Sequence, residues 1–224
     1  MRYVLSDLDG VLVDSGAAVE RVWREWAVGN GIDADLVARE SHGVPAYGVL
    51  ARVAPHLNTP EEIDRIERLH AATGGSALPC AAELLSRADA VVTSCSPGLA
   101  RARLRAAGLP APDVLITADL TRRGKPHPDP YLAGAAALGA DPADCLVIED
   151  APAGIEAGRA AGMTVWAVAT THPPEQLAAA DRVLDSLHEL PDLLWRRDPG
   201  SRRRSAAPPR GAAELPDTGT SRRR

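Results

Sequence analysis

Two acidic residues one position apart follow a short apolar run near the start of the chain, in the segment Asp7-Leu8-Asp9-Gly10. In an extended segment alternate side chains share a face, and the glycine lets the backbone turn, so we expect Asp7 and Asp9 to lie close together. Like charges at that distance repel unless a cation or a shared proton compensates them. The pair suits a metal-assisted site in which one carboxylate attacks and the other handles protons. A surface turn capped by acids is the alternative.

Two further segments carry groups that bind anions and cations. Thr93 and Ser94 precede a helix expected to begin near Pro97, and they offer a hydroxyl and free backbone N–H groups to an anion, although an ordinary helix cap has the same residues. Glu149 and Asp150 end an apolar run. Asp150 with Asp7 and a backbone carbonyl would give Mg²⁺ hard oxygen ligands, and an acidic helix cap is the alternative.

Lys125 is the only lysine in a chain that otherwise uses 24 arginines for its positive charges. One retained lysine indicates a site that needs a compact point charge, which the planar guanidinium does not replace. Prolines on both sides of His127 are expected to stiffen this loop. A lysine retained by chance is the alternative.

These polar segments need a scaffold, and the apolar pattern predicts a parallel sheet with helices on both faces. Such sheets bind ligands at the carboxyl ends of their strands. The predicted strands are Tyr3–Leu5, Ala90–Thr93, Val114–Thr117, Leu146–Ile148 and Val165–Val168. The predicted helices between them are Ala81–Arg87, Pro97–Ala107 (with Ser96 as N-cap), Pro130–Leu138 and Ala153–Ala161.

Residues 15 to about 78 break the alternation and contain no convincing strand. The predicted helices there are Ala18–Val28, Asp33–Glu40, Tyr47–Val53 and Pro60–Ala72. A stripe of Val19, Val22, Trp23 and Trp26 falls at helical spacing, and we interpret it as core of this insertion.

Together the four polar segments resemble the haloacid dehalogenase superfamily of phosphohydrolases, in that family's order across residues 3 to about 190. The chain is most similar to the branch of sugar- and polyol-phosphate phosphatases, which includes 2-deoxyglucose-6-phosphate and glycerol-phosphate phosphatases. The segments that carry this narrower resemblance are His42-Gly43-Val44-Pro45, Ala77-Leu78-Pro79, Ala151-Pro152-Ala153-Gly154-Ile155 and Thr170-Thr171-His172. The resemblance implies an α/β fold with a Rossmann-like core at residues 1–14 and 79–195, and a small α-helical cap at residues 15–78.

The resemblance also implies a role for each polar residue. Asp7 is expected to be the nucleophile that forms an aspartyl-phosphate, and Asp9 the general acid and base. Mg²⁺ is the implied cofactor, with Asp7, Asp9 and Asp150 at the metal and Glu149 orienting its water shell. The remaining implied roles are phosphate binding by Thr93, Ser94 and Lys125, charge neutralisation by Lys125, and substrate contacts in the cap by His42 and Gly43, with Tyr47 and His70 as further polar candidates.

The sequence departs from the family pattern at a few positions. Cys80 and Cys95 stand where glycine is usual, and we expect neither to touch a reacting group, although Cys80 would affect cap closure. A Schiff-base hydrolase is excluded because the cap has no lysine, and a dehalogenase because Asp9 and Asp150 are present. A hexose-phosphate mutase, for which Ala46 stands near the position of a phosphate-binding arginine, and a catalytically idle phosphosugar-binding protein are the remaining alternatives.

Composition and charge limit the partners. The net charge is −5, but residues 196–224 carry about +6 and the rest about −11, which disfavours nucleic acid as the main ligand, apart from weak contacts by the tail. We predict that this Arg- and Pro-rich tail, residues 196–224, is disordered. Three cysteines without metal-ligand spacing predict neither disulfides nor zinc. Without a long apolar span or a secretory signal pattern, we expect a cytoplasmic monomer, no membrane partner, and a small-molecule phosphate ester as substrate.

Overall fold

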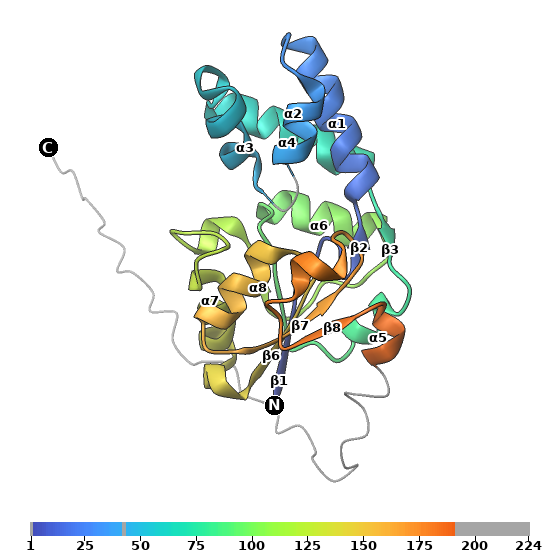
Figure 1. Cartoon of the computed structure of the whole chain (residues 1–224), viewed down its shortest axis with the longest axis vertical. Coiled ribbons are helices and arrows are strands. Elements are labelled where there is room, and N and C mark those ends of the chain that lie inside the picture. Colours follow the sequence, from blue (N-terminus) through green and yellow to red (C-terminus); the bar gives the residue numbers. More distant parts are fainter. Residues whose placement is uncertain (1, 42–43, 191–224) are drawn as a thin grey trace, which may run out of the picture.

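A computed structural model describes residues 2–41 and 44–190. Six parallel strands form one sheet in the order β5-β4-β1-β6-β7-β8 (Figure 1). The strands are β1 (Tyr3–Ser6), β4 (Ala90–Val92), β5 (Leu115–Ile116), β6 (Cys145–Glu149), β7 (Thr164–Val168) and β8 (Arg182–Leu184). The predicted α/β fold with a parallel sheet is confirmed. β8 was not predicted, because Arg182-Val183-Leu184 is too short to show a pattern.

The register of the central strands brings three polar segments to one edge of the sheet. Leu5 of β1 lies opposite Ala90 of β4 on one side and Val147 of β6 on the other. Parallel strands that start in register also end together, and the backbone N–H of Asp7 donates to the carbonyl of Ile148 at 2.9 Å. The residues that follow β1, β4 and β6 therefore meet at the carboxyl edge.

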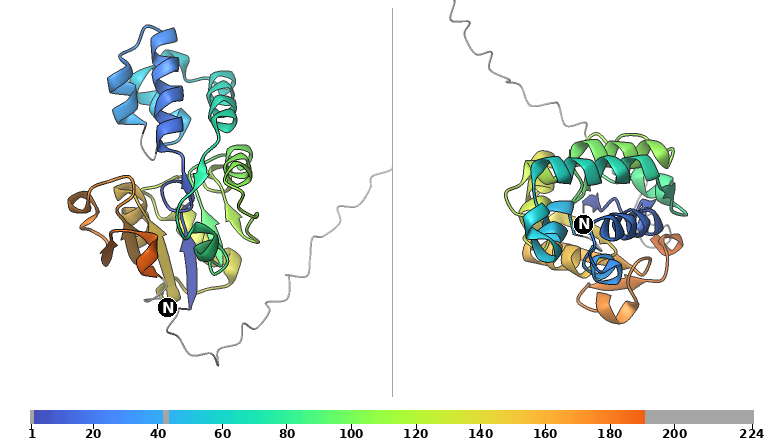
Figure 2. Two further views of the ribbon diagram at one scale, coloured as in Figure 1. Left: turned by 90° about the vertical axis from the view of Figure 1, so that its right-hand side faces the viewer. Right: turned by 90° about the horizontal axis from the view of Figure 1, so that it is seen from above.

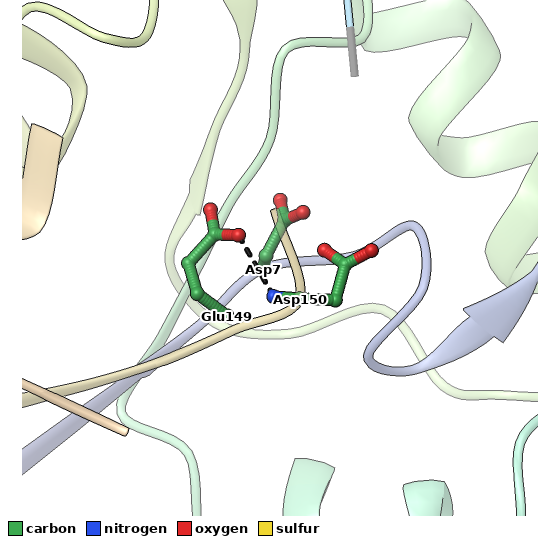
Figure 3. A group of neighbouring side chains, drawn as sticks. All are labelled: Asp7, Glu149 and Asp150. Atoms are coloured by element: carbon green, nitrogen blue, oxygen red, sulfur yellow. Dashed lines mark hydrogen bonds between the residues drawn. The ribbon is translucent and has the colours of Figure 1, made fainter. Parts of the chain in front are cut away.

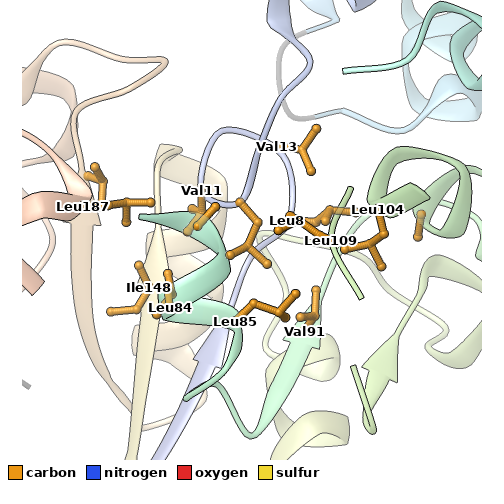
Figure 4. Packing of buried hydrophobic residues seen from close by; sticks show 14 of the residues in the cluster. Leu8, Val11, Val13, Leu84, Leu85, Val91, Leu104, Leu109, Ile148 and Leu187 are labelled. Carbon is orange, nitrogen blue, oxygen red and sulfur yellow. The ribbon is translucent and has the colours of Figure 1, made fainter. Parts of the chain in front are cut away.

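Helices cover both faces of the sheet, as the sequence predicts. Alternate residues of β6 separate the two cores: Leu146 and Ile148 belong to one buried cluster, and Cys145 and Val147 belong to the other. The first cluster, shown in Figure 4, is completed by α5 (Ala81–Leu85) and α6 (Pro97–Ala106). The second is completed by α7 (Asp129–Leu138) and α8 (Pro152–Ala160). The described part of the chain also contains five short 3₁₀ turns: η1 (Pro55–Leu57), η2 (Ala118–Leu120), η3 (Pro142–Asp144), η4 (Pro174–Leu177) and η5 (Leu187–Glu189).

Four helices between β1 and β4 form a separate group beyond the carboxyl edge of the sheet (Figures 1 and 2). They are α1 (Gly16–Gly29), α2 (Ala34–Glu40), α3 (Ala46–Val53) and α4 (Pro60–Thr73). Trp23 and Trp26 of α1 pack with ring centroids 5.5 Å apart inside a core of this group's own, which includes Val49 and Ile66. Trp23 and Trp26 of the predicted stripe belong to this core and Val19 packs against it, while Val22 is also buried but is not part of this cluster.

Two short antiparallel strands join the helical group to the sheet. In β2 (Val13–Asp14) and β3 (Ser76–Ala77), Val13 lies opposite Ala77 and Asp14 opposite Ser76. The expectation that residues 15 to about 78 contain no strand is wrong at Ser76–Ala77, because both residues are exposed and do not form the apolar run that marks a buried strand. The other predicted elements are present with ends shifted by one or two residues.

No helix in residues 2–41 and 44–190 is long and apolar enough to span a membrane. The predicted disordered tail, residues 196–224, and the last residues of the predicted core, 191–195, lie outside the described residues.

Candidate active site

Four chain segments meet in one cavity of about 270 Å³ between the carboxyl edge of the sheet and helices α1 and α4. Asp7 and Asp9 follow β1, Thr93 and Ser94 follow β4, and Lys125 comes from the loop before α7. Glu149 and Asp150 lie at the carboxyl end of β6. The structure thus brings together all seven polar residues that the sequence singled out around the sheet.

Lys125 lies at the centre of this arrangement. Its Nζ donates to Asp7 Oδ1 at 2.8 Å, to Glu149 Oε1 at 2.7 Å and to the carbonyl of Val92 at 3.2 Å. It also lies 5.0 Å from the ring centroid of Tyr131, whose hydroxyl donates to Glu149 Oε1 at 2.8 Å. Burial alone would lower the pKa of Lys125, but the charges of Asp7 and Glu149 raise it well above its ordinary value. The ammonium group is therefore held in its charged form.

Three buried carboxylates surround this single lysine. Asp7, Glu149 and Asp150 each offer an oxygen, and these atoms all lie within 4.8 Å of one another (Figure 3). Burial raises the pKa of Asp7 to about 7, and burial with the charges of Glu149 and Asp7 raises that of Asp150 well above its ordinary range. Lys125 compensates one of the three charges. The remaining negative charge and the all-oxygen donor set fit a hard divalent cation such as Mg²⁺.

Glu149 is the most completely engaged of the three carboxylates. One of its oxygens accepts from Lys125 and Tyr131, and the other accepts from the backbone N–H of Asp150 at 2.9 Å and of Ala151 at 3.1 Å. Burial raises its pKa, but Lys125 and these hydrogen bonds outweigh burial and lower it. Gly154 makes room for the side chain, because a Cβ there would lie 1.6 Å from Glu149 Oε1. Glu149 is thus a fixed support for Lys125.

Asp150 contacts the segment Thr170-Thr171-His172, which the sequence analysis used only as part of the family resemblance. The Thr171 hydroxyl donates to Asp150 Oδ2, and His172 Nδ1 lies 3.1 Å from the Asp150 carbonyl oxygen. Gly10, which has a φ of +76°, lies so close that a Cβ would come 2.0 Å from Asp150 Oδ2. Asp150 therefore packs between the turn after β1 and the turn after β7.

The Asp9 side chain faces a different wall of the cavity. Its Oδ1 accepts from the Ser15 hydroxyl at 2.6 Å, while its Oδ2 pairs with Arg103 and lies 3.1 Å from Cys95 Sγ. Its carboxylate is not part of the three-carboxylate group of possible metal ligands. The expectation that no departure from the family pattern touches a reacting group is wrong for Cys95, since the small thiol fills the space beside Asp9.

The candidate anion-binding segment, Thr93 and Ser94, precedes a helix that is capped as the sequence predicts. Ser96 caps α6, since its side chain accepts from the Leu99 N–H at 3.4 Å, and Pro97 occupies the first turn. The Thr93 hydroxyl accepts from the Cys95 N–H at 3.1 Å, which fixes the turn between β4 and α6. Thr93 and Ser94 both line the cavity in front of this helix.

The polar candidates in the helical group divide into three cases. His42 and Gly43 lie outside the described residues. Tyr47 is 48% exposed and does not line the cavity. His70 of α4 does line the cavity, but it is only 6% exposed and packs edge-on against Trp23 at 5.7 Å between ring centroids. The sequence analysis missed Arg103 altogether, although the helical spacing of α6 places it on the same face as Leu99 and Ala100, unlike the other two arginines of the helix.

Comparison with known proteins gives consistent matches. The model of the haloacid dehalogenase-like hydrolases matches residues 1–162. Hexitol phosphatase A of Escherichia coli (strain K12) is 44% identical over 197 residues, which are 83% of this chain and 91% of that protein. Glycerol-1-phosphate phosphohydrolase 2 of Saccharomyces cerevisiae is 34% identical over 185 residues, which are 75% of this chain and 74% of that protein. A solved hydrolase from Deinococcus radiodurans R1, with bound phosphate and sodium, has a TM-score of 0.66 and 34% identity, and the match covers 87% of this chain and 95% of that one.

Proposed function

The chain belongs to the haloacid dehalogenase-like hydrolases and is a phosphoric monoester hydrolase, and from this premise we propose that it is a Mg²⁺-dependent phosphatase of sugar or polyol phosphates. The observation that carries the proposal is the buried group in which Lys125 bridges Asp7 and Glu149 beside Asp150. The substrate class is proposed because two relatives, a hexitol phosphatase and a glycerol-phosphate phosphohydrolase, are named for phosphatase action of this kind.

In this proposal Asp7 is the nucleophile. One of its carboxylate oxygens attacks phosphorus, the bond from phosphorus to the substrate oxygen breaks, and an aspartyl-phosphate forms. Lys125, which is 2.8 Å from Asp7 Oδ1, positions that carboxylate and neutralises charge that develops on the phosphoryl group. The Thr93 hydroxyl and the backbone N–H of Ser94 bind the phosphoryl oxygens in front of α6. Glu149 holds Lys125 in place.

Asp9 completes the cycle as general acid and base. It gives a proton to the leaving oxygen of the substrate as the first bond breaks. It then takes a proton from the water that attacks the aspartyl-phosphate, which releases inorganic phosphate and restores the Asp7 carboxylate. Bound Mg²⁺, held by Asp7 and Asp150, would supply Lewis-acid stabilisation of the phosphoryl oxygens.

The helical group supplies the proposed substrate cap, residues 15–78, between the two core segments 1–14 and 79–195. Its α1 and α4 contribute Val19, Trp23, Glu67 and His70 to the cavity wall. An apolar wall that carries a few polar groups is suited to a small polyhydroxylated substrate. The substrate roles of His42 and Gly43 stay predictions, as do a monomeric state and a cytoplasmic location.

The test is phosphate release from a panel of sugar and polyol phosphates, with and without Mg²⁺, by the wild-type chain and Asp7→Asn. We expect metal-dependent release that disappears in the variant, with the highest kcat/KM for a polyol or sugar phosphate. Conversion of one hexose phosphate into another without phosphate release would indicate a mutase. Binding without turnover by the folded chain would indicate an idle phosphosugar-binding protein.

A further inference from the structure

Arg103 is a buried arginine with an unusual environment. It lies on the face of α6 that also carries Leu99, Ala100 and Leu104, all of which are packed in the first core cluster. Its side chain is 6% exposed. A charge on such a face is costly unless it is paired, and burying an ion pair contributes little net stability. The position therefore points to a function of the charge rather than to packing.

Arg103 makes its contacts with the Asp9 side of the cavity. Its Nη1 forms an ion pair with Asp9 Oδ2 and lies 3.3 Å from Cys95 Sγ, which is itself 3.1 Å from the same Asp9 oxygen. The Arg103 Nε has no hydrogen-bond partner among the described residues. Ser15 donates to the other Asp9 oxygen at 2.6 Å. Arg103, Cys95 and Ser15 thus hold the carboxylate from both oxygens, and they come from two parts of the chain, the segment after β4 and the residue after β2.

The Asp9 carboxylate is nevertheless accessible from the cavity, with 27% of the side chain exposed. A carboxylate that must reach a substrate oxygen needs a fixed direction, because small misplacements of a catalytic group cost large factors in rate. Lys125 fixes Asp7 in the same cavity by a direct ion pair. The two carboxylates proposed to react are therefore each held by their own cation, one from the loop before α7 and one from α6.

We propose that Arg103 is a positioning residue for Asp9, which it orients toward the leaving oxygen of the substrate. This inference rests on the proposed role of Asp9 as general acid and base. Arg103 takes no proton and forms no bond to the substrate. It acts through Asp9, while the proton moves from Asp9 to the leaving oxygen and later from water back to Asp9. Cys95 and Ser15 complete the same support.

The leaving group provides the test, because an alkoxide needs a proton from the enzyme and p-nitrophenolate does not. We would measure kcat and KM for the best polyol phosphate of the panel and for p-nitrophenyl phosphate. The variants are Arg103→Met and Arg103→Lys. The matched controls are Arg101→Met and Arg105→Met, which remove exposed arginines from the same helix.

The expected result is a split between the two substrates. In Arg103→Met, kcat/KM for the polyol phosphate, which reports the steps up to release of the leaving group, should fall roughly 10- to 100-fold, and kcat/KM for p-nitrophenyl phosphate should fall less than about threefold. Hydrolysis of the aspartyl-phosphate also uses Asp9 and is common to both esters, so kcat does not separate them. Arg103→Lys should recover part of the loss. The controls should match wild type. On an Asp9→Asn background, Arg103→Met should cause no further loss.

Equal losses of kcat/KM with both esters would overturn the proposal and assign Arg103 to phosphate or substrate binding. Should Arg103→Met not fold, Arg103→Gln replaces it, since a folded Arg103→Gln enzyme with the wild-type ratio of the two kcat/KM values contradicts a positioning role. Failure of the proposed function looks different. In that case the wild-type chain releases no phosphate from any ester, or Asp7→Asn retains the release.

Discussion

Lys125 explains at the scale of one residue why a chain with 24 arginines keeps a single lysine. Its three ammonium protons serve three acceptors in three directions: Asp7, Glu149 and the carbonyl of Val92. A planar guanidinium cannot donate in that arrangement from so small a volume. The sequence predicted the need for a compact charge, and the structure identifies the three acceptors that require it.

Gly154 is the second residue on which the site depends, because it leaves space for Glu149. We predict that Gly154→Ala lowers kcat at least about tenfold, since the new Cβ displaces the carboxylate that holds Lys125. Gly98→Ala is the matched control, because Gly98 also lies in the first turn of a helix but has nothing within 4 Å of an added Cβ. Phosphate release by the two variants checks the prediction. A Gly154→Ala enzyme with wild-type kcat would show that Glu149 has room to move.

Residue types at the strand ends could be predicted from the sequence, because each motif is local and its chemistry is carried by neighbouring residues. Asp7, Thr93 and Asp150 needed only the sheet to bring them together. The partner of Asp9 could not be predicted, since Arg103 is distant in sequence and is one of three arginines in its helix. The contact of Cys95 with Asp9 depends on the same packing of α6 and was missed for the same reason.

At the scale of elements, Cys80 marks the start of α5 and has a left-handed backbone, with φ of +64°. An L-residue in that region is strained, which gives a physical reason for the glycine that the family usually has here. The Cys80 Sγ lies 3.2 Å from His188 Nδ1, so the side chain also makes a contact. The effect of backbone strain at Cys80 can be isolated with two substitutions that both remove the contact with His188.

We predict that Cys80→Gly has a free energy of unfolding about 1 kcal/mol higher than Cys80→Ala. Both variants lose the contact with His188, but only alanine keeps the strained Cβ. Urea denaturation of the two purified variants gives the difference directly. Equal stability would mean that the chain before α5 relaxes to a conformation that alanine tolerates.

His70 links α4 to α1 and responds to pH. Burial lowers its pKa to about 4, with a further contribution from the charge of Arg103. The unfolded chain has a histidine pKa near 6.5, so between pH 6.5 and about 4 the unfolded state binds the extra proton. The His70 contribution to stability is therefore intact above pH 6.5 and falls as the pH is lowered, by up to about 3 kcal/mol.

We predict that His70→Leu flattens this part of the pH dependence, because leucine fills the site beside Trp23 without titrating. The free energy of unfolding is measured at several pH values for the variant and for wild type, and the difference between the two curves isolates His70. Exposed His56 of η1 provides the control, since His56→Gln should keep the wild-type slope. A parallel pair of curves for His70→Leu and wild type would contradict the prediction.

At the scale of elements, the apolar pattern of the sequence predicts the longer helices and strands well. Buried strands such as Leu146–Ile148 and long helices such as Pro60–Ala72 were found within one or two residues, because their periodicity extends over a full element. The two-residue strands β2 and β3 and the three-residue β8 were not predicted. Pairing with a neighbour defines such strands, and pairing is a tertiary property that the segment itself does not contain.

At the scale of the whole molecule, a cation bound by the three-carboxylate group would couple folding to metal binding. Asp150 is buried beside Glu149 and Asp7 with one lysine to compensate all three. Without a cation the charge of Asp150 opposes folding. A cation that binds only the folded state stabilises it in proportion to the logarithm of its concentration, by about 2.7 kcal/mol at a hundred times its Kd.

We therefore predict that Mg²⁺ raises the Tm of the wild-type chain and has little effect on Asp150→Asn. In metal-free buffer the variant should be more stable than wild type by about 1 kcal/mol, because a buried charge has been removed. Thermal melts with and without Mg²⁺ test both statements. Asp64→Asn, which removes an exposed acid from α4, should respond to Mg²⁺ as wild type does. A metal-free Asp150→Asn chain that is less stable than wild type would contradict the prediction.

The connection through β2 and β3 has a consequence for how such a protein changes over evolutionary time. Paired residues in antiparallel strands are roughly 5 Å apart, so the chain leaves the sheet-bearing part at Val13–Asp14 and returns at Ser76–Ala77 through neighbouring positions. A helical segment of another length or sequence, joined at the same two strands, would leave the ends of β1, β4 and β6 where they are. Under the proposed function, ancestral recombination or laboratory grafting at these two joints would exchange one set of ligand preferences for another while the proposed hydrolytic residues are inherited unchanged.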